Sequence, residues 1–565
     1  MTRLVTPIST NHDFTYDAIG QRNSMKSPLN KLTSYSYNGN RKLTQIDRPS
    51  GKTVVNTYVD DKLATTVTDE SIISYDYIFN NKIGTITKGS EKVDFNYDGD
   101  LLTSLVYNGA INQTLSYTYN NDFLPTSSTY AGKIENYTYD NDNLVLTSGD
   151  YIFTRDAANA YVTKVTDGKL VQDYTYDNYG ELVSVSDNTF TYEIISKDNA
   201  SLILQKTETI NNTTNTYAYT YDDNSRLIEV KKDNTTVEAY SYDNNGNRLS
   251  ATVNNITTTG SYTLDDQLEV YGNNTYRYDD DGYLEEKVTP DGTTTYSYST
   301  LGELQQVVTP DKTITYLHNV NNQRVAKLVD NVLVEKYLWA DLTTLLAIYD
   351  KDDNLVQRFE YANSRMPISL TQNSTKYYLH YDQVGSLRVV SDTNHNVIKE
   401  ITYDTYGNIV SDSNESFKVP FGFAGGLYDE DTKLVRFGYR DYDSYTGKWT
   451  AKDPIDFSGG DSNLYGYVLG DPVNFWDSEG LYRSQDPSYI FKEMAYPDNS
   501  TARKNSEYSI RHMKAYLNKL SLFKKLKKVD PRLKLGLKGL ESLIEKYIEA
   551  EENSLKELDK ENNDC

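Results

Sequence analysis

Aromatic and polar residues alternate along most of the chain, in short runs that end in a Tyr-Asp pair. The run 215–221 is an example, and its alternation places every second tyrosine on one face of an extended segment. Turn-forming residues follow such runs, as in Asp243-Asn244-Asn245-Gly246, where Asn, Asp and Gly tolerate positive φ and bond nearby backbone. A second short run, 248–253, completes the unit. The pattern predicts a β-hairpin.

The hairpin unit recurs. The chain contains 52 tyrosines, and most successive Tyr-Asp anchors lie 17 to 22 residues apart. The anchor tyrosines are Tyr16, Tyr75, Tyr97, Tyr139, Tyr176, Tyr221, Tyr242 and Tyr278, with looser copies at Tyr37, Tyr58, Tyr119, Tyr298 and Tyr316. The gap between Tyr176 and Tyr221 is about double and indicates a decayed copy. Two-stranded units cannot bury a face alone, so we expect them to stack into one long sheet. Independent all-β modules are the alternative, which the regular period without linkers disfavours.

Composition adds little chemistry. The single cysteine, Cys565, excludes an intrachain disulfide and favours synthesis in a reducing cytoplasm. Residues 1–7 lack the apolar segment of a signal peptide, and no 18-residue apolar run occurs. We therefore expect a protein made in the cytoplasm and secreted or displayed on the cell surface by a specialised secretion system.

Charge divides the chain into two unlike parts. The net charge is −24, but residues 482–565 hold 17 Lys and Arg against 14 Asp and Glu, a balance of +3. The body is therefore strongly acidic and is not expected to bind nucleic acid, because phosphates need a basic surface. Solubility is the simplest reading of the acidity.

Residues 377–475 carry a denser series of motifs than the array. The series comprises Tyr377–Arg388, Tyr403–Asn408, Pro420–Asp429, Leu434–Asp443, Thr446–Thr450, Asn463–Val468 and Asp471–Phe475. It resembles the core domain associated with Rhs/YD-repeat proteins, and the upstream hairpins resemble YD repeats. The resemblance covers residues 1 to about 481.

The resemblance implies both a fold and a function. In Rhs proteins and in the similar C-subunits of insecticidal Tc toxins, YD strands wind into a hollow shell, or cocoon, around a C-terminal toxin. The core domain closes one end and cuts the chain. Teneurins use a similar shell for adhesion. The expected fold is mainly β, with a YD-repeat shell over residues 1–330, a core with a self-cleavage motif over 331–481 and a variable effector over 482–565.

The cleavage residues follow from the family pattern, which has two Asp-Pro-x-Gly elements and a cut after a Leu that follows the second. This chain has Asp453-Pro454-Ile455-Asp456 and then Asp477-Ser478-Glu479-Gly480-Leu481. Asp453 and Asp477 are the candidate catalytic pair, because two adjacent carboxylates share one proton and can act as base and acid. The cut is expected between Leu481 and Tyr482.

Two neighbours are expected to support this pair. They are Lys452, which could hold a carboxylate ionised, and Gly480. Asp456 stands where Gly is usual and Ser478 where Pro is usual. The alternative is that both aspartates only cap turns.

Other chemistry is sparse. The five histidines are scattered and the only cysteine is terminal, so no metal site or cofactor is predicted. In the stretch His380–Gln383, Gln383 stands where relatives often carry a second His, so no metal-binding pair is inferred there.

The tail differs from the body in its pattern. Residues 506–528 show helical apolar spacing, Pro531 ends that run, and a second helical pattern extends to about residue 560. The tail is expected to be an α-helical effector whose activity and target stay open. A nuclease around His512, a membrane-active amphipathic helix and a degenerate toxin are the alternatives.

The sequence thus predicts an Rhs-family polymorphic toxin that encloses its own C-terminal segment as cargo and releases it by aspartyl-type autoproteolysis. Expected partners are a secretion-system spike or partner shell subunit and a cognate immunity protein. A non-cleaving adhesive YD-repeat surface protein is the main alternative.

Overall fold

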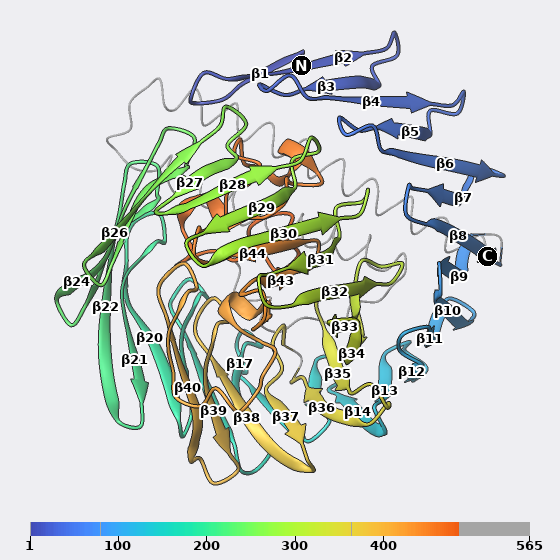
Figure 1. Ribbon diagram of the computed structural model, residues 1–565. Coiled ribbons are helices and arrows are strands. Elements are labelled where there is room, and N and C mark those ends of the chain that lie inside the picture. The colour runs from blue at the N-terminus through green and yellow to red at the C-terminus, as the bar shows by residue number, and fades with distance from the viewer. Residues whose placement is uncertain (1, 80, 363, 485–565) are drawn as a thin grey trace, which may run out of the picture. The chain divides into compact units, whose positions relative to one another are not determined.

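A computed structural model describes residues 2–79, 81–362 and 364–484 of the chain (Figure 1). Strands β1–β41 form one 41-stranded sheet in which consecutive strands pair antiparallel, and β42–β45 form a second, four-stranded sheet. The predicted fold class, a mainly β YD-repeat shell, is confirmed. None of the described residues belongs to a helix that is long and apolar enough to span a membrane.

The strands are short and nearly uniform. The first group is β1 Arg3–Val5, β2 Asn11–Tyr16, β3 Arg22–Lys26, β4 Leu32–Tyr37, β5 Leu43–Asp47, β6 Thr53–Val59, β7 Lys62–Val67, β8 Ile72–Ile78, β9 Lys82–Lys88, β10 Glu91–Asp98, β11 Leu101–Asn108, β12 Gln113–Tyr119, β13 Pro125–Tyr130 and β14 Lys133–Tyr139. The second is β15 Val145–Ser148, β16 Tyr151–Arg155, β17 Val162–Thr166, β18 Val171–Tyr176, β19 Leu182–Ser186, β20 Phe190–Lys197, β21 Ile203–Ile210, β22 Thr213–Tyr221, β23 Leu227–Lys232, β24 Thr235–Tyr242, β25 Arg248–Val253, β26 Ile256–Tyr262, β27 Leu268–Tyr271 and β28 Asn274–Tyr278. The third is β29 Leu284–Thr289, β30 Gly292–Tyr298, β31 Leu304–Val308, β32 Thr313–His318, β33 Arg324–Val329, β34 Val332–Trp339, β35 Leu345–Tyr349, β36 Leu355–Glu360, β37 Ser369–Gln372, β38 Thr375–Tyr381, β39 Leu387–Asp392, β40 Val397–Tyr403 and β41 Ile409–Asp412.

The aspartate of most Tyr-Asp pairs builds the turn that follows it. The predicted anchor at Tyr75 is wrong, because Tyr75 and Asp76 lie inside β8 and the register of that hairpin shifts at Tyr77. In the β24–β25 hairpin, Asp243 Oδ1 accepts hydrogen bonds from the backbone N–H groups of Asn245 (2.8 Å) and Asn247 (2.9 Å). Gly246 completes the turn at φ 81°, in the left-handed region that favours glycine. The predicted turn chemistry is confirmed.

The tyrosine of the pair joins one hairpin to the one before it. Most of these hairpins carry a β-bulge at the Tyr-Asp end, where the ladder shifts register, as between Thr220 and Tyr221 opposite Leu227. The Tyr242 hydroxyl of the next hairpin donates to the Leu227 carbonyl at 2.7 Å. The same bond, to the carbonyl of the residue that faces the preceding bulge, is made by Tyr37, Tyr58, Tyr139, Tyr176, Tyr221, Tyr262 and Tyr361.

The burial of the anchor tyrosines follows from their hydrogen bonds to the preceding hairpin. Tyr240, two residues before the anchor, is buried in the core, whereas Tyr242 is half-buried and packs against the same cluster. The register assigned from the sequence is therefore confirmed at this repeat. Tyr16 is the exception at 39% exposed, and the strand before its own, β1, pairs with β2 without a bulge.

The decayed repeat is visible between β20 and β21. Lys197-Asp198 replaces Tyr-Asp there, and Asp198 Oδ1 still accepts from the N–H groups of Ala200 and Leu202 at 2.8 and 2.9 Å. The turn was therefore retained although the tyrosine was lost.

The sheet winds back along itself, so that later hairpins contact earlier ones side by side. The contacting residues are 249 positions apart at Lys31–Asp280, 232 apart at Tyr107–Trp339 and 164 apart at Tyr242–Tyr406. We call this row of contacts between β2–β24 and β27–β41 the seam. The separation shrinks along the chain because the later strands cover the same length of seam with fewer residues.

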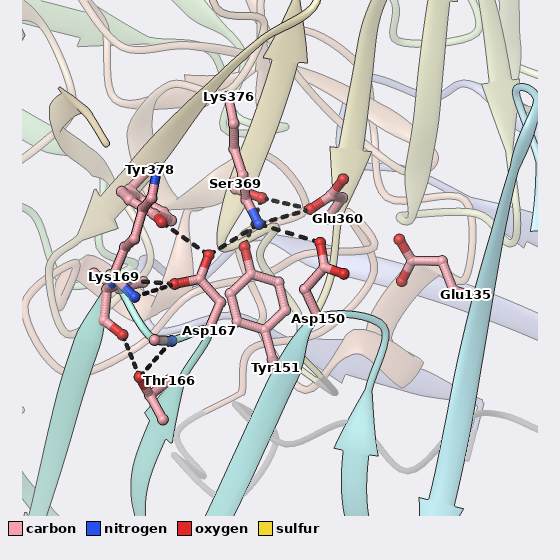
Figure 2. Close-up of polar contacts among 12 residues, drawn as sticks. Glu135, Asp150, Tyr151, Thr166, Asp167, Lys169, Glu360, Ser369, Lys376 and Tyr378 are labelled. Atoms are coloured by element: carbon pink, nitrogen blue, oxygen red, sulfur yellow. Dashed lines mark hydrogen bonds and ion pairs between the residues drawn. The ribbon is translucent and has the colours of Figure 1, made fainter. Parts of the chain in front are cut away.

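A cluster of charges, largely buried except for Asp150, lies in the middle of the seam (Figure 2). Lys376 of β38 points toward three carboxylates, with Nζ 3.0 Å from Asp167, 3.3 Å from Glu360 and 3.6 Å from Asp150. Glu360 also pairs with Lys133 of β14 at 2.7 Å. These cations hold the pKa of Glu360 below its usual value despite its burial.

The small sheet lies against the later strands of the long one. Its strands are β42 Leu427–Tyr428, β43 Val435–Phe437, β44 Arg440–Asp443 and β45 Lys448–Trp449, and three 3₁₀ turns accompany it: η1 Phe423–Gly425, η2 Asp456–Gly459 and η3 Val468–Gly470. It joins β29 through the bridge Tyr283–Ala451 and β33 through the ion pair Arg324–Asp441 at 3.0 Å. Buried rings around Trp449 form its core.

Two predicted boundaries are not decided by this architecture. The sheet continues through residues 330 and 331, between β33 and β34, so the division there remains a prediction. The tail from residue 485, with its predicted helices, lies outside the described residues.

The hydroxyl bridge can be tested at Tyr242. Tyr242→Phe leaves the Leu227 carbonyl without its donor and should lower the free energy of unfolding by about 1–2 kcal/mol. Tyr242→Ala also removes the packed ring and should cost about 3–5 kcal/mol. Urea denaturation followed by fluorescence measures both. Tyr179→Phe, at a ring 84% exposed, is the control and should change little; an equal loss in that variant would exclude the bridge as the cause.

The charged cluster can be tested at Lys376. Lys376→Met leaves buried carboxylates without their shared cation and should destabilise the fold by about 3 kcal/mol at pH 7. The pKa values of Asp167 and Glu360 lie below normal, so this stabilisation exists above their unfolded-state values and is lost as pH falls through the folded-state values. The difference from wild type should therefore disappear in acid.

Lys351→Met is the matched control for that experiment, because Lys351 pairs with Asp352 on the surface and both side chains are more than half exposed. It should leave the free energy of unfolding close to that of wild type. A Lys376 variant as stable as this control at pH 7 would show that the seam does not need the cluster.

Candidate functional site

The candidate catalytic aspartates lie together beside the predicted cleavage point. Asp453 follows the small sheet and Asp477 lies in the last loop of the core, and both are buried, at 7% and 3% exposed. The link between them is Arg440, the first residue of β44. Its Nη2 lies 3.0 Å from Asp453 Oδ2 and 3.5 Å from Asp477 Oδ2.

Arg440 also binds the backbone near the predicted cut. Its Nε donates to the Gly480 carbonyl at 2.5 Å, and its Nη1 donates to the Leu464 carbonyl at 3.4 Å. Its guanidinium stacks on the Trp449 ring at 4.3 Å, which fixes the plane of the fork. One side chain thus positions both carboxylates and the chain that leads to Leu481.

Each aspartate is also held by backbone. Asp453 Oδ1 accepts from the N–H of Ile455 at 2.9 Å, and Asp477 Oδ1 accepts from the N–H of Leu481 at 3.0 Å. The second bond brings Asp477 to one of the two residues that flank the predicted cut. The aspartates do cap turns, as the structural alternative required, but the same turns carry them to the cleavage segment.

The carbonyl of Leu481 lies near Asp453. A Cβ built on Gly459 would lie 2.7 Å from the Leu481 carbonyl oxygen and 2.9 Å from Asp453 Oδ2. Both oxygens therefore occupy space that any side chain at Gly459 would fill. Gly480 is restricted in the same way, because its φ is 69° and a Cβ there would lie 2.6 Å from the Phe437 carbonyl.

The electrostatics favour one shared proton. Burial raises the pKa of Asp477 to about 6, with Arg440 opposing the shift and Asp453 adding to it. Burial also raises the pKa of Asp453, again against Arg440. One guanidinium faces two carboxylates, so a proton on Asp477 balances the charge.

The other predicted site residues have different surroundings. Lys452 Nζ pairs with Asp456 at 2.9 Å, and the side chain that contacts both candidate aspartates is Arg440. Asp456 adopts φ 51°, the left-handed region that favours glycine, which explains why Gly is usual there. Arg22 supports this conformation through an ion pair with Asp456 at 3.4 Å. Tyr482 is 55% exposed.

Sequence reasoning missed Arg440 and Gly459. Arg440 stands within the core series, and the available signal was the need of a buried carboxylate pair for a cation. No sequence signal indicated Gly459, because its requirement arises only when residues 453 and 481 meet in space.

A second constellation resembles a catalytic triad but is fully enclosed. His380 Nδ1 lies 2.7 Å from Asp187 Oδ2 and its Nε2 lies 2.8 Å from Ser391 Oγ. The His380 and Asp187 side chains are 0% exposed, so no substrate can reach them. Their contact instead joins β38 to the end of β19, across the seam. Within residues 2–79, 81–362 and 364–484, no group of three or more His, Cys, Asp or Glu side chains is arranged to hold a metal ion.

Solved structures share this fold. The crystal structure of TcdB2-TccC3-Cdc42 matches with a TM-score of 0.64 at 15% identity, covering 83% of this chain and 28% of that one. The crystal structure of TcdB2-TccC3 matches with a TM-score of 0.59 at 16% identity, covering 85% and 32%. Both structures contain more than one component of a Tc toxin.

Curated relatives match by sequence. Teneurin-1 of Gallus gallus is 33% identical over 240 residues, which is 41% of this chain and 9% of that protein. Teneurin-3 of Mus musculus is 26% identical over 277 residues, 46% of this chain and 10% of that protein. The tRNA3(Ser)-specific nuclease WapA of Bacillus spizizenii is 29% identical over 168 residues, 29% of this chain and 7% of that protein. The chain spans a tenth or less of these relatives.

The family comparison covers most of the body. The Teneurin YD-shell family matches residues 1–469, which include the whole long sheet and most of the core. The matched residues include the Tyr-Asp hairpins and the strands of the small sheet. The chain belongs to the Teneurin YD-shell family and is an Rhs/YD-repeat shell protein.

Proposed function

We propose that this chain is the shell of a polymorphic toxin that cuts itself after Leu481 and so frees residues 482–565. The observation that supports this proposal most directly is Arg440, which binds Asp453, Asp477 and the Gly480 carbonyl at once. A purely structural pair of turn caps would not need both carboxylates beside one backbone segment.

The two aspartates take different roles in this proposal. Asp453 is the closer to Arg440 and acts as the ionised general base, which takes a proton from a water that attacks the Leu481 carbonyl carbon. Asp477, whose pKa burial raises to about 6, acts as the protonated acid and donates to the carbonyl oxygen.

The step balances in atoms and charge. Water adds its oxygen to the Leu481 carbon, and one of its protons goes to Asp453. The tetrahedral intermediate then collapses, the bond from Leu481 carbon to Tyr482 nitrogen breaks, and a proton from Asp453 passes to the leaving amine. Asp477 regains its own proton as the carbonyl re-forms. Both products are then ordinary chain ends.

The remaining parts of the proposal concern cargo and delivery. The tail 482–565 is the cargo, a neutralising immunity protein protects the producer, and a spike or partner shell subunit delivers the assembly from the cytoplasm. The multi-component Tc structures with the same fold support the partner subunit. The WapA match supports a toxin role, including a nuclease activity for the tail.

An adhesive shell without cleavage is the second candidate, favoured by the teneurin relatives. It predicts one uncut chain whatever residues 453 and 477 are. The same measurement therefore separates the two functions.

Removal of either carboxyl should stop the cut. Asp453→Asn and Asp477→Asn keep the side-chain size but cannot exchange the proton, so each should yield the intact 64.4 kDa chain. Wild-type protein should yield a body ending at Leu481 and a tail starting at Tyr482. Intact-mass spectrometry of purified protein measures the products.

Asp471→Asn is the matched control for these variants. Asp471 also precedes a proline, is buried and has a pKa raised to about 6 by burial, but it caps the turn at Asn474. This variant should be cut like wild type. Cleavage of the Asp453 and Asp477 variants at the wild-type rate would refute the catalytic roles.

The cut should also depend on pH. If protonated Asp477 is the acid, the cleavage rate should fall about tenfold per unit as pH rises above about 6, the pKa that burial produces. Denatured full-length chain refolded at pH 5 to 8 and sampled over time by electrophoresis measures the rate. A rate that rises steadily through pH 8 would assign Asp477 a different role.

A further inference from the structure

A polar cavity lies between a repeat turn and the core, outside the aspartate site. Its volume is about 170 Å³, and it is bounded on one side by the turn between β24 and β25 and on the other by segments around β45 and η3. The charged side chains at its wall are Arg226, Arg248, Lys448 and Asp461. Three cations and one carboxylate thus face one cavity in a chain whose net charge is −24.

Arg248 is buried without a carboxylate partner. It is 5% exposed, and within the described residues its side chain makes no ion pair. Its Nη2 donates to the Tyr271 hydroxyl at 2.9 Å and to the Tyr445 carbonyl at 2.7 Å, whereas its Nε has no hydrogen-bond partner. A buried cation whose donors are only partly used is costly to the fold.

The surroundings of Arg248 reduce this cost without removing the charge. Its guanidinium lies 4.5 Å from the Tyr406 ring centroid and 5.3 Å from that of Tyr271. Gly447 also lines the cavity, and a Cβ there would lie 2.9 Å from Arg248 Nη1. Because Gly447 has no side chain, this edge of the guanidinium is not covered. The fork is held rigidly by rings on its faces.

Lys448 is the second buried cation without an ion pair. Its Nζ binds only uncharged oxygens, those of the Asn247 and Asn463 side chains and the Asp266 carbonyl. Burial lowers the pKa of Lys448 to about 8, while the carboxylates of Asp266, Asp461 and Asp243 oppose the shift from beyond ion-pair distance, so Lys448 is still mostly charged at pH 7. Arg226 is different, because it pairs with Asp222 at 2.7 Å and adds no unbalanced charge.

We infer that this cavity binds a small tetrahedral oxyanion of the phosphate class, held by Arg248 and Lys448. A fixed guanidinium fork matches phosphate oxygens, and an ammonium supplies a second point charge. Asn244 and Ser462 at the wall offer further polar groups. The bound anion would add to the hydrogen bonds that already join the turn 243–248 to the core, such as Lys448 to Asn247.

The test uses a charge at the exposed wall of the cavity. Asn244 is exposed and lines the cavity, so Asn244→Asp adds a negative charge there without disturbing the fold. Asn178 holds the same position after Tyr176-Asp177 in another repeat and is also exposed, and it does not line the cavity; Asn178→Asp is the matched control. Isothermal titration of full-length protein with inorganic phosphate, at constant ionic strength and pH 7, gives the dissociation constant.

Wild type and Asn178→Asp should bind one phosphate with the same affinity, and Asn244→Asp should bind about tenfold more weakly, as expected for one added charge at close range. Glycerol phosphate is the second probe: binding equal to that of inorganic phosphate would identify a phosphate group carried by a larger molecule as an acceptable source, and weaker binding would identify the free anion. Absence of saturable binding, or equal affinity in all three proteins, would overturn the inference and leave Arg248 as a structural cation held by rings.

Discussion

The bond from a tyrosine hydroxyl to the carbonyl that faces the preceding bulge sets the geometry of the whole body. A β-bulge at the end of each hairpin bends the strand and removes a ladder pairing. In Tyr242 and its equivalents, the next hairpin supplies the missing donor. The bulge bends the sheet and the hydroxyl fixes the step from one hairpin to the next, so a repeated local bond produces the long winding that brings late strands back to early ones.

The features that the sequence could predict are those that depend on residues close together in the chain. The hydroxyl bridge itself was not predicted, although it accounts for the use of tyrosine where phenylalanine would supply similar packing. The period, the turn chemistry of Asp243 and Gly246, and the decayed copy at Asp198 all follow from local residues and were predicted. The seam was not, since its partners lie up to 249 positions apart and pair through isolated side chains such as Lys31 and Asp280. No local pattern encodes such pairs.

The candidate cleavage site was also predicted only in its local parts. Asp453 and Asp477 could be proposed from motif and spacing because both lie in short segments with recognisable turns. Arg440 lies in a different strand, and only folding of the small sheet brings it between them. Its position makes the pair chemically unequal, since one guanidinium can neutralise one carboxylate and burial then favours a proton on the other. The asymmetry that acid–base chemistry needs thus comes from the fold and not from the motif.

The buried arginines of this acidic chain differ in whether a carboxylate pairs with them. Three buried arginines have carboxylate partners: Arg324 pairs with Asp441, Arg388 with Glu208 and Arg440 with the aspartate pair. Arg365 lacks one, but its two terminal nitrogens donate to the carbonyls of Ala424 and Val384, and burial lowers its pKa to about 10. Arg248 has neither an ion pair nor a full set of acceptors, and it alone of these five lines the cavity beside Lys448. In a chain with so large a surplus of carboxylates, a buried cation left unpaired beside an open space is better explained by an anion from outside than by a shortage of partners within.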